Sequence, residues 1–385
     1  CGWLPKLVSE GFEGKIFCSH PTKEIARLIL QDSAKIQEEE AEMANKNGYS
    51  KHNPATPLYT LEEAKRVLPM FRVVEPNLEV KLADNCWFKL FYASHVLGAC
   101  SLEIHVEDKI LIFSGDIGQD DDVLMFPPIK PKQADYVFLE STYGNRIHPQ
   151  ENVLLELESI INNTVNRNGN VVIPSFAVER VQTMMYLIWQ LRKQDRIPNI
   201  KYIIDTPMGI SVLDIFRDNL KWHKLTAKDC EEMCDTFTLI SDYQDTIAAI
   251  YDENPKVVIA ASGMVTGGRV LSYLEKYITE PENTVILVGF QAEGTRGRRL
   301  LEGEKEIKIH GKFYPVNANI LSIEGLSAHG DKNDLLNWIS ELEKPPTKIF
   351  LIHGENMALD GLRIKIAERY KYNCQIPILN QVIEI

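Results

Sequence analysis

Residues 71–116 alternate apolar and polar side chains with a period of two. Runs such as Trp87 to Phe91 and Ser101 to Val106 are separated by polar turns, and a further apolar run covers residues 135–139. This pattern predicts a set of β-strands, several of them joined as hairpins. The end of the chain returns to the same pattern, with an apolar run at residues 348–352 that reads as a buried strand.

The middle of the chain shows strand-like runs separated by long helical segments. The runs cover residues 170–174, 201–205, 256–261 and 284–289, and helices are expected at about 151–167 and 177–194. Strands joined by long helical crossovers pair in parallel, so this pattern predicts a doubly wound α/β layer. The flanking strand-rich parts then form one domain, which the α/β layer interrupts.

Composition restricts the class of protein. The chain has 385 residues, of which 44% are hydrophobic and 25% are charged, as expected for an ordinary globular protein of two domains. Its apolar runs all fall short of the ~20 residues of a membrane helix, so we expect no membrane partner. Seven scattered cysteines suit a reducing cytosol, which favours a cytoplasmic location. Because the chain begins with Cys1 and not with Met, we expect further residues upstream.

The net charge of -12 argues against broad, sequence-independent binding of nucleic acid. A local basic site remains compatible with this charge. The best candidate is the cluster formed by Arg296, Arg298 and Arg299.

Five residues with metal-binding or acid–base side chains stand where an apolar run gives way to small residues. They are His95, Asp116, Glu140, His329 and His353. Imidazole and carboxylate groups are the ligands that zinc and manganese prefer. We therefore predict that His95, Asp116 and His353 bind metal, and that Glu140 and His329 form an acid–base pair beside it.

A structural interpretation of these residues is also open. An aspartate before glycine at a strand end is most often a turn residue, and a lone histidine is more often structural than a ligand. The other histidines lack the strand-end setting, and we interpret them as surface or structural residues: His20, His52, His105, His148, His223 and His310.

Two further segments follow strands and could contact phosphate. Ser262 and Gly263 open a glycine-rich stretch that ends at Arg269, where backbone N–H groups and the guanidinium could bind an anion. A tight turn between strand and helix explains these glycines equally well. Arg180 follows the run at residues 170–174, and its side chain could face a cleft or cover a helix surface.

Several strings together resemble the β-CASP branch of the metallo-β-lactamase superfamily. In chain order they are Ser114-Gly-Asp-Ile-Gly118, Leu139-Glu-Ser-Thr-Tyr-Gly-Asn-Arg146, Pro174-Ser-Phe-Ala-Val-Glu-Arg180, Ala261-Ser-Gly-Met264 through Arg269, Gly289-Phe-Gln-Ala-Glu-Gly-Thr295, Ser327-Ala-His-Gly-Asp331 and Ile352-His-Gly-Glu355. They span nearly the whole chain in the order that the family shows. The segment from Gln31 to His52 looks more like the prokaryotic relatives of the catalytic subunit of the cleavage and polyadenylation specificity factor.

This resemblance implies an α/β fold in which an αββα metallo-β-lactamase sandwich carries an inserted doubly wound β-CASP domain. The expected boundaries are residues 1–144 and 327–385 for the sandwich and 145–326 for the insertion. The resemblance also implies two zinc ions, hydrolysis of single-stranded RNA, and a homodimer as one option. Arg180, Ser262, Gly263 and Arg269 are then expected to contact RNA phosphates.

One departure from the family pattern concerns the main ligand motif, His-x-His-x-Asp-His. In the family this motif precedes an element that Gly2-Trp-Leu-Pro5 matches here. The resemblance therefore implies four ligands before Cys1 and a chain that is truncated at its N-terminus. The function expected is a metal-dependent ribonuclease, with a non-catalytic RNA-binding or scaffold protein of the same family as the alternative. A hydrolase of small esters or thioesters on the same fold is disfavoured by the inserted domain.

Overall fold

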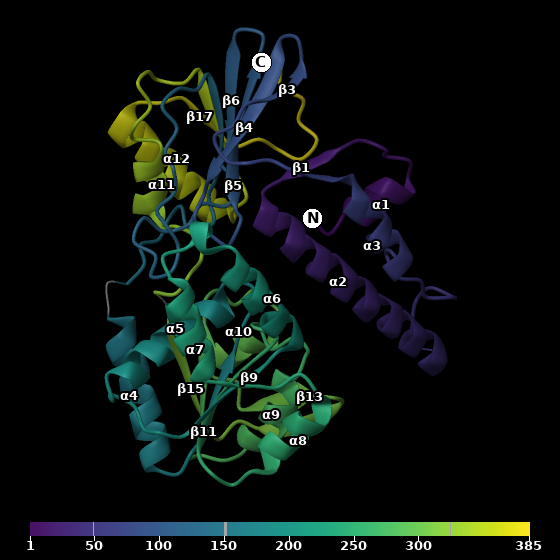
Figure 1. The fold of residues 1–385 in the computed structure, drawn as a ribbon, viewed down its shortest axis with the longest axis vertical. Helices are drawn as coiled ribbons and strands as arrows, with labels where there is room; N and C mark the ends of the chain where they lie inside the picture. Colours follow the sequence, from purple (N-terminus) through teal and green to yellow (C-terminus); the bar gives the residue numbers. More distant parts are fainter. Residues whose placement is uncertain (49, 150–151, 324) are drawn as a thin grey trace.

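A computed structural model describes residues 1–48, 50–149, 152–323 and 325–385. Glu324, in the apolar run before His329, and Glu151, at the start of a predicted helix, lie outside the described residues. Figure 1 shows two α/β regions stacked along the long axis, with a third, N-terminal region to one side of them.

The first region is built on a seven-stranded mixed sheet in the order β17-β16-β7-β6-β5-β4-β3. Its strands are β3 (Val80–Ala83), β4 (Cys86–Tyr92), β5 (Cys100–Val106), β6 (Lys109–Phe113), β7 (Tyr136–Glu140), β16 (Lys348–Ile352) and β17 (Cys374–Gln375). Strands β3 to β6 pair as antiparallel hairpins, and β6, β7, β16 and β17 pair in parallel. Helices α11 (Lys332–Trp338) and α12 (Asn356–Tyr370) cover one face, with Trp338 and Leu362 fully buried against it.

The second region is a six-stranded, wholly parallel sheet in the order β10-β9-β11-β8-β12-β15. Its strands are β8 (Val171–Pro174), β9 (Lys201–Asp205), β10 (Thr238–Leu239), β11 (Lys256–Ala260), β12 (Thr284–Val288) and β15 (Asn319–Ile323). The helices are α4 (Val153–Asn166), α5 (Arg180–Lys193), α6 (Pro207–Asp218), α7 (Ala227–Asp235), α8 (Tyr243–Tyr251), α9 (Val270–Tyr277) and α10 (Arg296–Leu301). One hydrophobic core joins the sheet to α4, α5, α6 and α7, and another joins it to α8, α9 and α10.

The two cores on opposite faces of this sheet confirm the predicted doubly wound layer. One predicted boundary is wrong: the helix expected from residue 177 begins at Arg180. Glu179, which precedes it, has a φ of +68° and cannot continue a right-handed helix. A hairpin of β13 (Glu306–Ile309) and β14 (Lys312–Pro315) completes this region.

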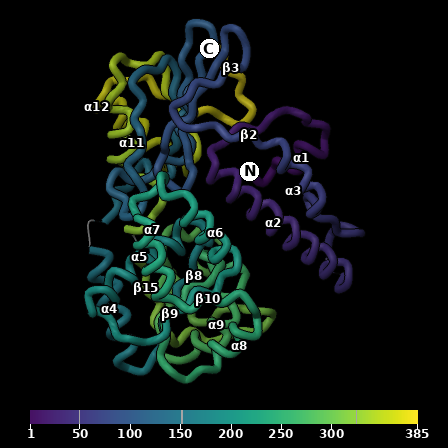
Figure 2. Tube along the Cα trace, in the orientation of Figure 1, coloured from purple at the N-terminus to yellow at the C-terminus, as the bar shows by residue number. Residues whose placement is uncertain are grey.

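The N-terminal region consists of α1 (Leu4–Ser9), α2 (His20–Asn47), α3 (Leu61–Val67) and a parallel pair, β1 (Ile16–Cys18) with β2 (Phe71–Val73). Two short 3₁₀ turns, Leu68–Met70 and Leu220–Trp222, complete the regular structure. The end of α2 projects away from both sheets (Figure 2). Among the described residues, no helix is long and apolar enough to span a membrane.

Candidate active site

The topology of the seven-stranded sheet brings four of the candidate residues to one edge. Strands β6, β7 and β16 are parallel neighbours, so their carboxyl ends meet at the same edge. Asp116 lies just after β6, Glu140 is the last residue of β7, and His353 directly follows β16. His95 follows β4, which also runs parallel to β6 because both strands are antiparallel to β5.

The carboxylate of Asp116 lies between two histidines. Its Oδ1 atom is 2.9 Å from Nδ1 of His353, and its Oδ2 atom is 3.5 Å from Nε2 of His95. Burial opposes ionisation of Asp116, but the contact with His353 and the nearby imidazoles outweigh it and lower the pKa to about 2. The contact with Asp116 in turn raises the pKa of His353. Asp116 is therefore a carboxylate at neutral pH with one oxygen directed to each histidine.

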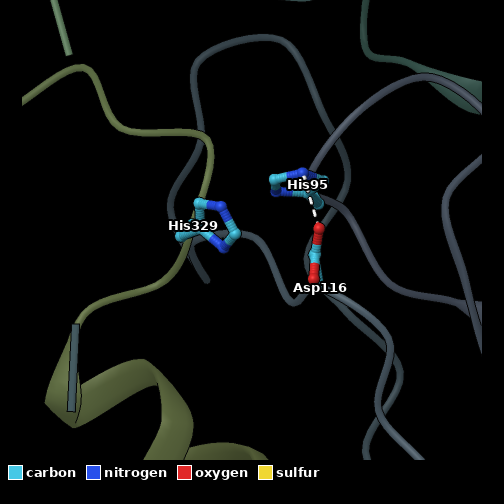
Figure 3. A group of neighbouring side chains, drawn as sticks. All are labelled: His95, Asp116 and His329. Atoms are coloured by element: carbon cyan, nitrogen blue, oxygen red, sulfur yellow. Dashed lines mark ion pairs between the residues drawn. The ribbon is translucent and has the colours of Figure 1, made fainter. Parts of the chain in front are cut away.

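His329 reaches this edge from the other region of the molecule. The chain leaves the parallel sheet after β15 and crosses to the N-terminus of α11, and His329 lies on this crossing. Figure 3 shows its ring beside His95 and Asp116, and the ring centroids of His329 and His95 are 4.4 Å apart. Sequence separation gives no indication of this contact.

Glu140 holds the ring of His329. Its Oε1 atom lies 3.0 Å from Nδ1 of His329. The same carboxylate is fully buried and accepts hydrogen bonds from the backbone N–H of Ile117, at 2.7 Å, and of Thr142, at 3.1 Å. These bonds fix the orientation of the carboxylate. Nδ1 of His329 is taken by Glu140, and Nε2 has no hydrogen-bond partner among the described residues.

His95, Asp116 and His329 have the chemistry and spacing of a cation site. One potential ligand atom from each of the three lies within 4.8 Å of the others. The buried Nδ1 atom of His95 has no hydrogen-bond partner among the described residues. Burial, together with the neighbouring His329, lowers the pKa of His95, which favours the neutral imidazole that binds metals. The residues present therefore fit a divalent cation such as zinc.

This grouping differs from the predicted one in a single member. The sequence analysis assigned His353 as the third ligand and His329 as an acid–base residue. The structure places His329 within the three-residue group and His353 on the opposite oxygen of Asp116. Both histidines thus adjoin the same carboxylate site.

Strained backbone and small residues position the histidines. His95 has a φ of +35° and His353 a φ of +52°, a region that residues other than glycine rarely adopt. A Cβ atom on Gly118 would lie 2.2 Å from the backbone nitrogen of His95, so only glycine allows this close approach. Gly118 is therefore a packing requirement of the site.

A cavity of about 530 Å³ opens from the histidines towards the parallel sheet. His95 and His329 line one part of it, and Glu179 and Arg180 line another. The last two side chains are buried and form an ion pair of 3.3 Å, and Nε of Arg180 has no hydrogen-bond partner among the described residues. Burial raises the pKa of Glu179, although the charge of Arg180 opposes this shift. Arg180 thus lines a cleft, which is one of the two positions that the sequence left open.

Arg269 has a different environment from the one predicted. Its guanidinium pairs with the fully buried Asp205 at 2.6 Å and donates to the carbonyl of Ser241. It is absent from the residues that line the cavity at the histidines. Its contacts in this structure support β9, and the binding of phosphate by Arg269 stays a prediction.

The glycine-rich turn before Arg269 provides hydrogen-bond acceptors for its own backbone N–H groups. The hydroxyl of Ser262 accepts from the N–H groups of Thr266, at 3.0 Å, and Gly267, at 3.2 Å. A Cβ on Gly263 would lie 2.8 Å from the ring of Phe176, so this glycine serves close packing. The turn interpretation, which the sequence left open, accounts for both residues.

The predicted arginine cluster is largely engaged with its own neighbours. Arg298 pairs with Glu302 at 2.7 Å and Arg299 with Glu304 at 3.3 Å. The guanidinium of Arg296 donates to backbone carbonyls, including that of Lys308 at 2.7 Å. The cluster is therefore not an open basic patch.

His148, which the sequence analysis interpreted as surface or structural, belongs to the surroundings of the site. Its Nε2 atom lies 2.9 Å from the carbonyl oxygen of His329, and its backbone N–H donates to Asp331. Tyr143 packs edge-on against its ring at a centroid distance of 4.8 Å. No strand-end pattern marks His148, and the one available signal was its position shortly after the Glu140 string.

Comparisons with known proteins place these features in a family. The sequence model of the Beta-Casp domain matches residues 181–300, and that of the Zn-dependent metallo-hydrolase RNA specificity domain matches residues 314–377. The chain belongs to the β-CASP branch of the metallo-β-lactamase superfamily. The resemblance drawn from the sequence strings is thereby confirmed, together with the α/β fold class.

Relatives of this β-CASP protein match along nearly all of its length. "Ribonuclease TTHA0252" of Thermus thermophilus is 28% identical, and the match covers 96% of this chain and 81% of the length of that relative. An "RNase J-like protein" of Methanocaldococcus jannaschii is also 28% identical, over 100% of this chain and 86% of its own. The "Transcription termination factor FttA" of the same organism is 27% identical, and the matched part is 61% of its length.

Proposed function

We propose that this β-CASP protein is a metal-dependent ribonuclease that hydrolyses phosphodiester bonds of single-stranded RNA. The observation that carries the proposal is the meeting of His95, Asp116 and His329, held by Glu140, at the mouth of a cavity lined by residues of both α/β regions. The names of the relatives, a ribonuclease and an RNase J-like protein, support the same reaction.

His95, Asp116 and His353 would hold the metal. A zinc ion bound there supplies a Lewis acid and lowers the pKa of a bound water towards neutrality. In this proposal His353, on the other oxygen of Asp116, is the third ligand, and Nε2 of His329 is left for proton transfer. Zinc is the metal proposed because the matched C-terminal domain is named as Zn-dependent.

Glu140 and His329 would manage the proton of the leaving group. Hydrolysis joins the oxygen of water to phosphorus and breaks one P–O ester bond, and the departing oxygen then needs a proton. Glu140 fixes the Nδ1 side of His329, so Nε2 is the atom that faces the reaction. The buried carboxylate of Glu140 also keeps the ring of His329 in this orientation.

The architecture supports the proposed domain boundaries. The strands of the seven-stranded sheet come from residues 80–140 and 348–375, and those of the parallel sheet from residues 171–323. Boundaries after residues 144 and 326 separate the two sets. A cytosolic location, which suits free cysteines and a substrate such as cellular RNA, is part of the same proposal.

The test is cleavage of an end-labelled single-stranded RNA by the full-length natural protein, with zinc or manganese and with EDTA. We expect cleavage with metal, none with EDTA, and a loss of at least a hundredfold in kcat for His329→Ala with RNA binding retained. His310→Ala is the matched control, because His310 also pairs with a carboxylate, that of Glu275, at 3.0 Å but far from the site.

RNA that binds tightly and is never cut under any metal condition would contradict the enzyme and support a scaffold protein. Turnover of a thioester that RNA does not inhibit would contradict the substrate class. If His329→Ala cleaves as fast as the natural protein, the proposed role of His329 is wrong.

A further inference from the structure

Phe290 lies where three cavities meet. Its side chain lines the cavity of about 530 Å³ at His329, a cavity of about 260 Å³ at His353, and a third of about 140 Å³ beside His148. Phe290 is 40% exposed, although it directly follows the buried strand β12 and Gly289, whose φ is +84°. An aromatic face is therefore presented to solvent within reach of the candidate active site.

Arg146 lines two of the same three cavities, those of about 260 and 140 Å³. Its backbone is fixed, because its N–H donates to Tyr143 and its carbonyl accepts from Lys332. Its guanidinium has neither an ion pair nor a hydrogen bond with any residue that the structure describes. Arg298, which shares the smaller cavity, instead has Glu302 as a partner.

An exposed aromatic ring and an unpaired guanidinium are the two groups that bind a single-stranded nucleotide. Bases stack on aromatic side chains whatever their sequence, and arginine pairs with the phosphate in a two-pronged contact. The overall charge of -12 disfavours broad binding of a polyanion, so an unpaired arginine in a cavity is informative.

We infer that Phe290 and Arg146 form a nucleotide subsite for single-stranded RNA, with a base stacked on Phe290 and an adjoining phosphate on Arg146. The subsite rests on the proposed function and deepens it, because it gives the strand a path past His329 and His353. Base stacking on one side and a phosphate contact on the other fix the position of the backbone between them. The subsite recognises nucleotide chemistry and not a particular sequence.

The test is the binding of a fluorescein-labelled single-stranded oligonucleotide RNA in EDTA, over a range of salt concentrations, so that neither metal nor cleavage contributes. We expect Phe290→Ala to weaken binding about tenfold at every salt concentration, and Phe290→Trp to bind as the natural protein does. We expect Arg146→Gln to weaken binding and to reduce the salt slope by about 0.7, the value for one phosphate contact with a single strand.

Two matched controls come from the same chain. Phe313→Ala removes an aromatic side chain that is 66% exposed on β14, outside the three cavities. Arg66→Gln removes one exposed positive charge on α3 and so changes the net charge equally. Neither control is expected to alter affinity by more than about twofold.

The outcomes separate the subsite from the proposed function. If the natural protein binds RNA and the Phe290 and Arg146 variants bind as tightly as their controls, the subsite is wrong and the ribonuclease proposal stands. If the natural protein does not bind single-stranded RNA at all, both are wrong. An abasic nucleotide series that leaves the effect of Phe290→Ala unchanged would overturn the stacking role alone.

Discussion

His353 and Asp116 form an ion pair in which Nδ1 lies 2.9 Å from Oδ1, on the side of the carboxylate that faces away from His95. The two residues come from the ends of β16 and β6, which are separated in the sheet by β7 alone. A single carboxylate is thereby shared between a half-exposed and a nearly buried histidine. This arrangement suits a carboxylate that holds a cation in cooperation with either or both imidazoles.

The first prediction concerns metal content. Asp116→Asn is expected to abolish zinc binding, because it removes the charge that both imidazoles share, and His95→Ala is expected to do the same. Elemental analysis of protein dialysed against zinc measures the result, with His310→Ala as the control for a histidine–carboxylate pair elsewhere. Comparing His329→Ala with His353→Ala decides which of them is a ligand. Full zinc content in Asp116→Asn would exclude the site.

The second prediction concerns Glu140. Glu140→Gln keeps the shape of the side chain but weakens its hold on Nδ1 of His329, so kcat for RNA cleavage should fall by about 10²- to 10⁴-fold. KM and RNA affinity in EDTA should change little. The control is Glu103→Gln, because Glu103 also pairs with a histidine, His105 at 2.7 Å, on β5. Equal losses of activity in both variants would mean that the effect is structural.

The third prediction concerns the buried pair of Arg269 and Asp205. Arg269→Ala leaves a fully buried carboxylate without its charged partner and should lower the free energy of unfolding by about 3 kcal/mol, measured by urea denaturation. Arg217→Ala, which removes an exposed pair with Asp214, should cost less than about 1 kcal/mol. Adding Asp205→Asn to Arg269→Ala should restore part of the stability. A variant that is fully stable but binds RNA poorly would instead support the phosphate role.

The fourth prediction concerns the fully buried Lys256 on β11. Burial lowers its pKa from 10.5 to about 8. The unfolded chain therefore binds more protons than the folded chain between pH 8 and 10.5, so this residue adds stability as pH rises through that window. Relative to Lys256→Met, the natural protein should gain about 2 kcal/mol of unfolding free energy from pH 7.5 to 9.5.

Urea denaturation at the two pH values measures the free energy of unfolding of the natural protein and of Lys256→Met. Subtracting one from the other cancels the titration of the buried cysteines, which both proteins contain. Lys46→Met, at the exposed end of α2, should show no such change with pH. A difference that is constant between pH 7.5 and 9.5 would show that Lys256 keeps an ordinary pKa in the folded protein.

The local features of the site could be recognised in the sequence because they depend on consecutive residues. A period-two run marked the position of Asp116 and a continuous apolar run that of His353. The two residues meet because both of their strands pair in parallel with β7. The alternation of strands and helices likewise predicted the doubly wound layer. The boundary at Arg180 was missed because the positive φ of Glu179 is a property of the packed turn.

Other features depend on contacts between distant residues and had no local pattern. Nε2 of His148 meets the carbonyl of His329 across 181 positions, and Arg269 meets Asp205 across 64. Whether an arginine is free or paired is decided by such contacts, and this is why Arg146 and Arg269 look alike in the sequence and differ in the structure.

By itself the sequence determined the family, the two kinds of sheet and the strand ends that carry the candidate ligands, since each follows from short-range periodicity and from strings of neighbouring residues. The tertiary structure alone decided that His329 joins His95 and Asp116, that His148 supports it, and that Phe290 and Arg146 face shared cavities. These relations arise when two regions pack against each other, and the free energy of that packing is set by surfaces whose residues are far apart in the chain.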